Sequence, residues 1–139
     1  MTYSSFTGGG LEQYKKVSLQ SEIEAASPHR LIQMLMEGAI RKIATAKLCI
    51  QNSQVAGKGE NISTAISIVS CLRASLDKEE GSEIAENLDN LYDYIERRLL
   101  EANLRSDVHI LDEISGLIGE IKSAWDAISP DLEVKQRTG

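Results

Sequence analysis

The sequence is poor both in residues that interrupt helices and in residues that build reactive sites. Its 139 residues include only two prolines, two cysteines and two histidines, and aromatic residues make up 4%. Pro28 and Pro130 leave nearly everything between them free to form helix. Cys49 and Cys71 lack CxxC spacing, which favours reduced thiols over a disulfide scaffold. Since 42% of the residues are apolar, the core is expected to consist mostly of Leu, Ile and Ala, as in a helical bundle.

The sequence also lacks a basic stripe and long apolar runs. Its net charge of −6 would be repelled by nucleic acid, so no nucleic-acid partner is expected. No apolar run is long enough to cross a bilayer. The first ten residues, MTYSSFTGGG, lack the basic and apolar regions of a signal peptide. These absences predict a cytoplasmic protein that is not inserted into a membrane.

The sequence also lacks the motifs of metal sites and catalytic sites. His29 and His109 lie on different segments, and neither belongs to the Glu-x-x-His motif of di-iron bundles. His109 with Asp112 and Glu113 would make a weak metal half-site, and a solvated helix start is the favoured interpretation. No Ser or Cys has a recognisable base at motif spacing. The sequence therefore predicts no enzyme, no metal and no cofactor. Several helical carboxylates are expected on solvated faces: Glu37, Asp89, Asp93 and Glu96.

The first long helix is predicted from Ser27 to about Asn52. Ser27 can cap the free amides, and Pro28 at the first helical position loses no needed hydrogen bond. The apolar arc covers nearly half of the helix circumference, so the helix either lies centrally in a bundle or keeps an apolar strip for a partner. The arc comprises Leu31, Ile32, Leu35, Met36, Ala39, Ile40, Ile43, Ala46 and Ile50.

Two more helices follow a loop predicted over residues 52–59, whose glycines would stop the first helix. The second helix has a clean stripe from Ile62 to Leu76. The third is expected to be capped by Ser82 and to end near Asn103. Its stripe comprises Ile84, Leu88, Leu91, Tyr92, Ile95, Leu99 and Ala102.

Tyr94 and Leu100 do not belong to that stripe. A tyrosine off the core face offers a large, stiff, amphipathic surface to a partner. Alternatively, Tyr94 lies over a neighbouring helix. The residues alone favour neither interpretation.

A fourth helix is predicted between an N-cap at Asp107 and the stop at Pro130. Its stripe is the most regular in the chain, and we expect one narrow face with a mainly structural role: Ile110, Leu111, Ile114, Leu117, Ile118, Ile121, Ala124, Trp125 and Ile128. Short loops make neighbouring helices antiparallel, so the fold class is an all-α, antiparallel four-helix bundle.

Three regions are expected along the chain. Residues 1–10 are predicted to be a flexible arm, residues 11–128 a single helical-bundle domain and residues 129–139 a disordered polar tail. The bundle domain would start with an additional short helical arm, which is too brief to be stable alone. Its apolar edge consists of Leu11, Tyr14 and Val17.

Two blocks of sequence resemble a known family. The blocks are ASPHRLIQMLMEGAI, from Ala26 to Ile40, and LDKEEGSEIAENLDNLYDYIERRLLEANLRSD, from Leu76 to Asp107. Together with Tyr14 and the pair Ala124-Trp125, they resemble the FliS family of flagellar export chaperones. The likeness runs from about Tyr14 to Ile128. Met36 stands where family members commonly carry an aromatic residue, although Met could still line a groove.

The resemblance implies a helical bundle around which the disordered C-terminal segment of flagellin wraps. It implies that the chaperone prevents premature polymerisation and delivers its client to the flagellar export apparatus. We expect a monomer or weak homodimer. We expect the client groove along the first and third long helices: Leu31, Leu35, Ala39, Ile43, Asn87, Leu88, Leu91, Tyr92 and Tyr94. The arm residues Leu11, Tyr14 and Val17 would cover part of this groove when no client is bound.

Two other functions remain open at this point. One is a helical adaptor or regulator with a different client. The other, less favoured, is a metal-binding bundle enzyme.

Overall fold

The computed structural model describes residues 21, 23, 25–76 and 83–128. The chain divides into two compact units, Met1–Leu31 and Ile32–Gly139, and the bundle discussed below belongs to the second. The predicted N-terminal arm, the Ser82 cap and the C-terminal tail lie outside the described residues.

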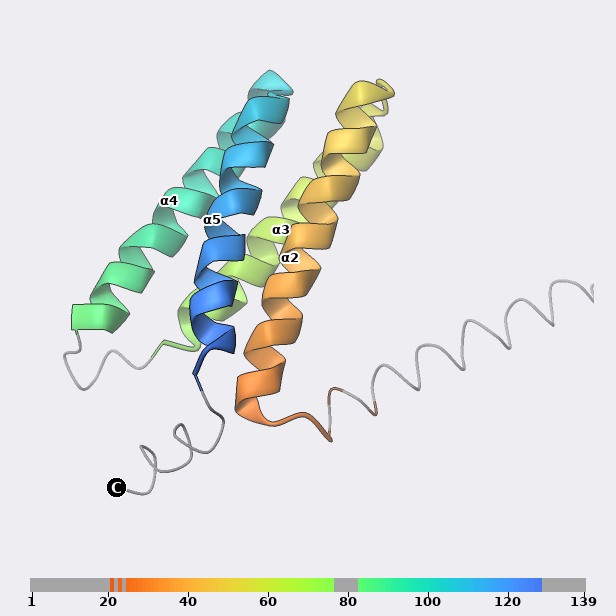
Figure 1. Ribbon diagram of the computed structural model, residues 1–139. Coiled ribbons are helices and arrows are strands. Elements are labelled where there is room, and N and C mark those ends of the chain that lie inside the picture. The colour runs from red at the N-terminus through yellow and green to blue at the C-terminus, as the bar shows by residue number, and fades with distance from the viewer. Residues whose placement is uncertain (1–20, 22, 24, 77–82, 129–139) are drawn as a thin grey trace, which may run out of the picture. The chain divides into compact units, whose positions relative to one another are not determined.

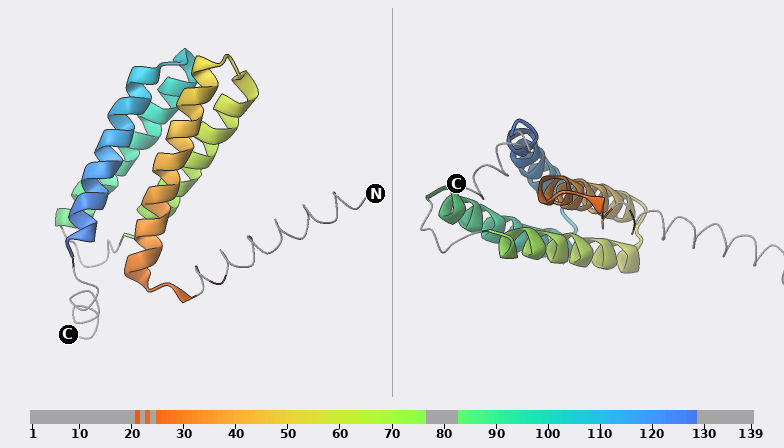
Figure 2. Two further views of the ribbon diagram at one scale, coloured as in Figure 1. Left: turned by 45° about the vertical axis from the view of Figure 1, so that its right-hand side comes forward. Right: turned by 90° about the horizontal axis from the view of Figure 1, so that it is seen from below.

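Four helices account for nearly all of the described chain: α2 (Pro28–Gln51), α3 (Val55–Ala74), α4 (Glu83–Arg105) and α5 (Val108–Asp126). Within the second unit, consecutive helices run antiparallel (Figure 1). Seen end-on they occupy four corners, with α2 opposite α4 and α3 opposite α5 (Figure 2). The predicted all-α bundle is confirmed.

Two of the predicted helix starts are confirmed by their caps. The Arg30 amide donates to Ser27 Oγ at 3.1 Å. Asp107 Oδ1 accepts from the amides of His109, at 2.9 Å, and Ile110, at 3.4 Å. Both caps satisfy amides that have no partner inside their own helix.

The predicted loop over residues 52–59 is wrong, because α3 already begins at Val55. A tight turn joins α2 to α3, in which Ser53 has a positive φ of 56° and the Gln54 amide donates to the Cys49 carbonyl at 2.8 Å. A Cβ on Gly57 would lie 2.8 Å from Cys49 Sγ, so this glycine lets two helices approach closely rather than ending one. Tertiary packing here outweighs the low helix propensity of glycine.

The core is aliphatic, as predicted. It joins all four helices, and its innermost side chains are less than 3% exposed: Met36, Ala39, Ile43, Ala46, Ile62, Ala65, Val69, Leu72, Ile95, Leu99, Ala102, Leu111, Ile114 and Ile118. The prediction for Ile84 is wrong, since this side chain is 72% exposed. Ile84 lies in the first turn of α4, at the end of the predicted stripe.

Candidate functional site

The distinctive feature of the bundle is that α4 and α5 spread apart. A short turn joins them at one end, and they diverge toward the C-terminal end of α5 (Figures 1 and 2). Residues seven apart share a helix face, and their burial records this divergence. On α4, Ile95 is fully buried while Leu88 is only half-buried. On α5, Ile118 is 1% exposed while Trp125 is half-buried.

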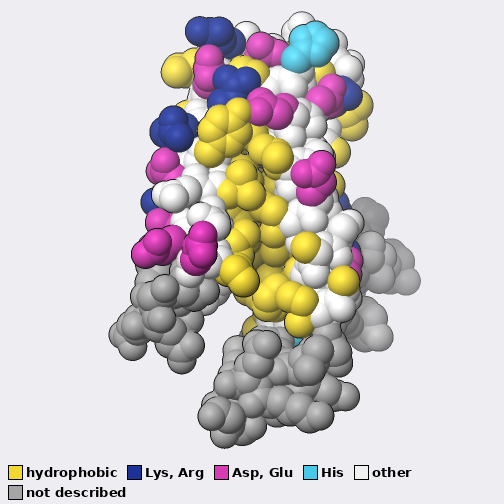
Figure 3. Space-filling view, turned by 60° about the vertical axis from the view of Figure 1, so that its left-hand side comes forward, with side chains coloured by type: hydrophobic (Ala, Val, Ile, Leu, Met, Phe, Trp, Pro, Cys, Tyr) yellow, Lys and Arg dark blue, Asp and Glu magenta, His cyan; other side chains and the backbone are white. Residues whose placement is uncertain are grey.

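The spread leaves a line of apolar side chains accessible between the two helices. We call it the apolar seam and define it by five half-buried residues that pack against the core: Leu88, Leu91, Leu117, Ile121 and Trp125. It appears as a continuous yellow stripe running between α4 and α5 (Figure 3). Two further apolar residues, Ile84 and Ile128, lie at its open end and are 72% and 40% exposed. An extended apolar surface of this kind is typical of a binding site.

A polar cluster closes the other end of the seam. The Tyr94 hydroxyl on α4 donates to Glu113 on α5. Arg98 Nη2 donates to the same carboxylate at 3.0 Å, and its Nη1 donates to Glu101 at 2.6 Å. Arg97 Cζ lies 5.9 Å from the centroid of the Tyr94 ring. Tyr94 therefore lies over the neighbouring helix, as the second interpretation of this residue proposed.

These contacts shift the ionisation of the groups that make them. The hydrogen bond to Glu113 raises the pKa of Tyr94, because a neutral phenol is needed to donate it. The hydrogen bonds from Tyr94 and then Arg98 lower the pKa of Glu113. Glu113 in turn raises the pKa of Arg98. All three pKa shifts favour the bonded forms near neutral pH, so the cluster clamps α4 to α5 there.

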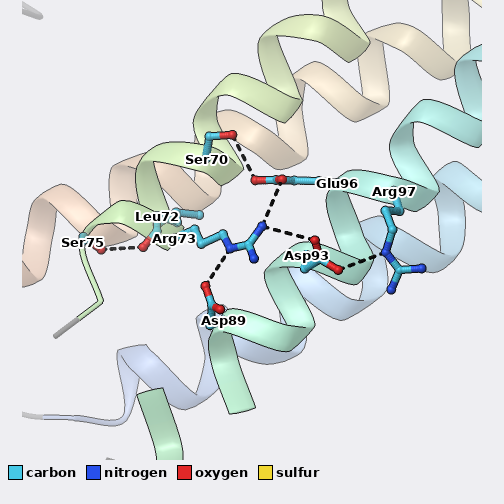
Figure 4. Close-up of polar contacts among 8 residues, drawn as sticks. All are labelled: Ser70, Leu72, Arg73, Ser75, Asp89, Asp93, Glu96 and Arg97. Atoms are coloured by element: carbon cyan, nitrogen blue, oxygen red, sulfur yellow. Dashed lines mark hydrogen bonds and ion pairs between the residues drawn. The ribbon is translucent and has the colours of Figure 1, made fainter. Parts of the chain in front are cut away.

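The opposite edge of α4 is tied to α3 by one arginine (Figure 4). Arg73 Nε donates to Asp89 at 2.6 Å, and its Nη1 lies 3.3 Å from Asp93 and 3.5 Å from Glu96. Ser70 Oγ also donates to Glu96, at 3.0 Å. The hydrogen bond to Asp89 is the main reason why the pKa of Arg73 is raised. The side chains of these three carboxylates stay 22%, 42% and 20% exposed, so they face solvent as predicted and in addition bind a neighbouring helix.

The predicted groove residues of the first long helix do not line the seam. Ala39 and Ile43 are 0% and 2% exposed and belong to the core. Met36 is also buried, at 2%, so it fills the interior instead of lining a groove. Leu35 is half-buried on α2, which stands opposite α4 in the bundle. Leu31 is half-buried and belongs to the unit Met1–Leu31.

The predicted groove residues of the third helix divide between seam and core. Leu88 and Leu91 lie in the seam, and Tyr94 lies at its closed end. Asn87 is exposed, one helical turn before Leu91. Tyr92 is 3% exposed and belongs to the core, and burial raises the pKa of its phenol. The structure therefore brings together α4 and α5 instead of α2 and α4.

Sequence reasoning missed the contribution of α5, namely Leu117, Ile121 and Trp125. The predicted face of this helix was narrow and mainly structural. Its nine apolar positions span about 140° when plotted at 100° per residue, which is broader than one core contact needs. The breadth of that arc was the available signal.

The structure gives no support to a metal site in the part of the chain that it describes. Within those residues, no three His, Cys, Asp or Glu side chains gather to hold an ion. Near His109, Asp112 pairs with Lys47 of α2 at 2.9 Å, whereas Glu113 pairs with α4. The two carboxylates of the weak half-site are thus directed to different helices. Among residues 21, 23, 25–76 and 83–128, no helix is long and apolar enough to cross a membrane.

Comparisons with known proteins agree on one family. The family model described as flagellar protein FliS matches residues 10–132. The flagellar secretion chaperone FliS of Salmonella typhimurium is 47% identical over 132 residues, which cover 94% of this chain and 98% of that protein. Its counterpart in Vibrio cholerae is 45% identical over 123 residues, covering 88% and 90%. The Bacillus subtilis counterpart is 31% identical over 121 residues, covering 86% and 90%. This chain therefore belongs to the FliS family of flagellar proteins.

Proposed function

We propose that this protein is a cytoplasmic flagellar export chaperone that binds the disordered C-terminal segment of flagellin along the apolar seam. Binding would prevent premature polymerisation and keep flagellin competent for the flagellar type III export apparatus. Membership of the FliS family supports the chaperone role. The observation that carries the assignment to the seam is the alignment of five half-buried apolar side chains between α4 and α5.

The seam suits a client that folds when it binds. A disordered segment with apolar residues at helical spacing can lay one face between α4 and α5, in the position of an additional bundle helix. The gain from apolar burial is partly offset by the entropy lost on ordering. Binding is therefore expected to be reversible, which suits a client that must later be released for export.

The mechanism needs no chemical step. A flagellin segment held in the seam has its apolar face covered, so that face cannot contact other flagellin molecules. The residues named here act through packing and hydrogen bonding, and the proposed role is non-catalytic. We expect the protein to act as a monomer or weak homodimer.

The single tryptophan of the chain offers a direct test, because Trp125 belongs to the seam. A flagellin C-terminal peptide without tryptophan should shift the Trp125 emission to shorter wavelength as it excludes water from the ring. Calorimetry at several temperatures should give a negative heat-capacity change on binding. An unchanged emission spectrum in the presence of bound peptide would show that the client binds elsewhere.

Matched substitutions separate the seam from apolar surface in general. Ile121→Gln alters the seam, whereas Leu104→Gln alters an α4 side chain that is 86% exposed and lies off the seam. We expect Ile121→Gln to weaken peptide binding by roughly 1–2 kcal/mol, about tenfold, and Leu104→Gln to leave it unchanged. Ile121→Gln should also restore flagellin polymerisation in a light-scattering assay. Equal effects of the two variants would contradict the proposal.

A further inference from the structure

The helix segments that form the open half of the seam are rich in carboxylates. Residues 83–96 and 116–127 border that half, and they carry seven carboxylates and one cation, Lys122. Their balance of −6 equals the formal net charge of the whole chain, so the remaining charges cancel. The helix segments that contain the open half of the seam are therefore acidic, although three of their carboxylates face α3.

Four of these carboxylates are already bound by cations of the bundle. Arg73 binds three of them on the α3 side of α4. Lys122 Nζ binds Asp126 at 2.6 Å. The other three belong to exposed residues: Glu83, Glu86 and Glu120.

Helical geometry places two of the exposed carboxylates on the two lips of the seam, by which we mean the edges of α4 and α5 that border it. Glu83 and Tyr94 are eleven residues, or about three turns, apart, so they share one edge of α4. Tyr94 contacts α5, which shows that this edge is turned toward α5. Glu120 lies seven residues after Glu113, on the edge of α5 that contacts α4. Acidic side chains lie on both sides of the yellow stripe, whereas most basic side chains in this view gather near the closed end (Figure 3).

We propose that the seam selects a helical client segment whose apolar stripe is flanked by lysine or arginine. This inference rests on the proposed function, because it takes the seam as the client site. Basic flanks would meet Glu83 and Glu120 when the apolar stripe contacts the seam, whereas acidic flanks would be repelled. The bound client helix also removes water from around these carboxylates, which strengthens their attraction to its lysine or arginine side chains.

The test uses two synthetic helical peptides of about five turns, long enough to follow the seam. Both lack tryptophan and carry the same leucine stripe, but one has lysines at the flanking positions and the other glutamates. Binding to the full chain is followed by Trp125 emission and calorimetry. The lysine peptide should bind at least about tenfold more tightly at low salt, and raising the ionic strength to about 0.5 M should remove most of this preference.

Two protein variants decide whether the lips cause the preference. Glu120→Gln removes a lip carboxylate, and Glu60→Gln removes an exposed glutamate of α3 away from the seam. We expect Glu120→Gln to reduce the lysine preference severalfold and Glu60→Gln to leave it almost unchanged. Equal reductions would overturn the inference, because the net charge alone would then be responsible.

The outcomes also separate this inference from the proposed function. If both peptides bind equally and both shift the Trp125 emission, charge selection is overturned while the seam remains the client site. If neither peptide binds, and flagellin binds without a change in emission, the proposed client site itself is overturned together with the inference.

Discussion

Two glycines inside helices differ in the space that surrounds them. A Cβ on Gly38 would meet Ile68 Cδ1 at 3.6 Å, which is ordinary van der Waals contact. A Cβ on Gly57 would meet Cys49 Sγ at 2.8 Å, and Cys49 is itself only 6% exposed. Of these two glycines, Gly57 is therefore the one that packing requires.

We expect Gly38→Ala to raise the free energy of unfolding by about 0.5–1 kcal/mol, because alanine loses less backbone entropy in a helix. Gly57→Ala should lower it by roughly 1–3 kcal/mol through overpacking. Urea denaturation of both variants measures the two effects. Combining Gly57→Ala with Cys49→Ala should recover much of the loss, and an absence of coupling in this double-mutant cycle would contradict the proposed contact.

Tyr94 and Glu113 form the contact that closes the seam, and its pH range follows from the two pKa shifts. The lowered pKa of Glu113 means that its contribution to stability is present above the ordinary carboxyl value of about 4.3 and is lost as the pH falls through the lowered pKa. The raised pKa of Tyr94 means that its contribution is present below about 10 and is lost as the pH rises through the raised pKa. The contact therefore operates throughout the neutral range.

Tyr94→Phe keeps the ring and removes the hydroxyl. We expect the pKa of Glu113 to rise toward its ordinary value in a carboxyl NMR titration, while Arg98 still holds it partly down. The melting temperatures of the variant and the native protein should differ at neutral pH and converge in acid. An unchanged Glu113 titration would show that the hydrogen bond is absent in solution.

At the scale of elements, α5 supplies both core and surface. Ile118 is 1% exposed inside the bundle, whereas its neighbour Leu117 is half-buried in the seam. Stability and client binding should therefore be separable by adjacent substitutions on this helix.

Ile118→Ala should cost about 2–5 kcal/mol of unfolding free energy, as expected for a fully buried aliphatic side chain. Leu117→Ala should cost only roughly 1–2 kcal/mol, because less of its area leaves water on folding. The order should reverse for binding of the flagellin peptide, with Leu117→Ala showing the larger loss. Denaturant melts and calorimetry on both variants measure the two properties, and the same order in both would contradict the division.

Arg73 joins α3 to α4 through three carboxylates. Arg73→Gln would leave Asp89, Asp93 and Glu96 close together without their shared cation. We expect a lower melting temperature at neutral pH, and the deficit should shrink in acid as the carboxylates are protonated. Arg105→Gln is the control, since this arginine is 69% exposed and pairs with Glu101 of its own helix. Equal effects of the two variants would argue against a special role for Arg73.

At the scale of the whole molecule, the N-terminal arm is predicted to cover part of the client site reversibly. Its apolar edge, Leu11, Tyr14 and Val17, is short and lies outside the described residues. Deleting residues 1–18 should leave the cooperative melting of the bundle intact and should not abolish binding of the flagellin peptide. Circular dichroism and calorimetry test both expectations, and unfolding of the truncated chain would show that the segment belongs to the core.

Local sequence was sufficient for most of the fold. Helix periodicity identified the four helices, and the caps at Ser27 and Asp107 were predictable because they depend on neighbours only two or three residues away. The prediction that Gly57 ends a helix was wrong, because this glycine makes room for Cys49 on another helix. Arg73 shows the same limit, because its carboxylate partners lie sixteen or more residues along the chain.

The sequence by itself determined an all-α, acidic chain whose helices carry more apolar surface than one core needs, because periodicity and composition are local properties. Only the tertiary structure decided where the surplus lies. On α4, the same helix face is buried at Ile95 but only half-buried seven residues away at Leu88. On α5, the same change occurs between Ile118 and Trp125. The reason is that α4 and α5 diverge from a short turn, and the angle between two helices depends on the packing of the whole bundle rather than on either helix alone.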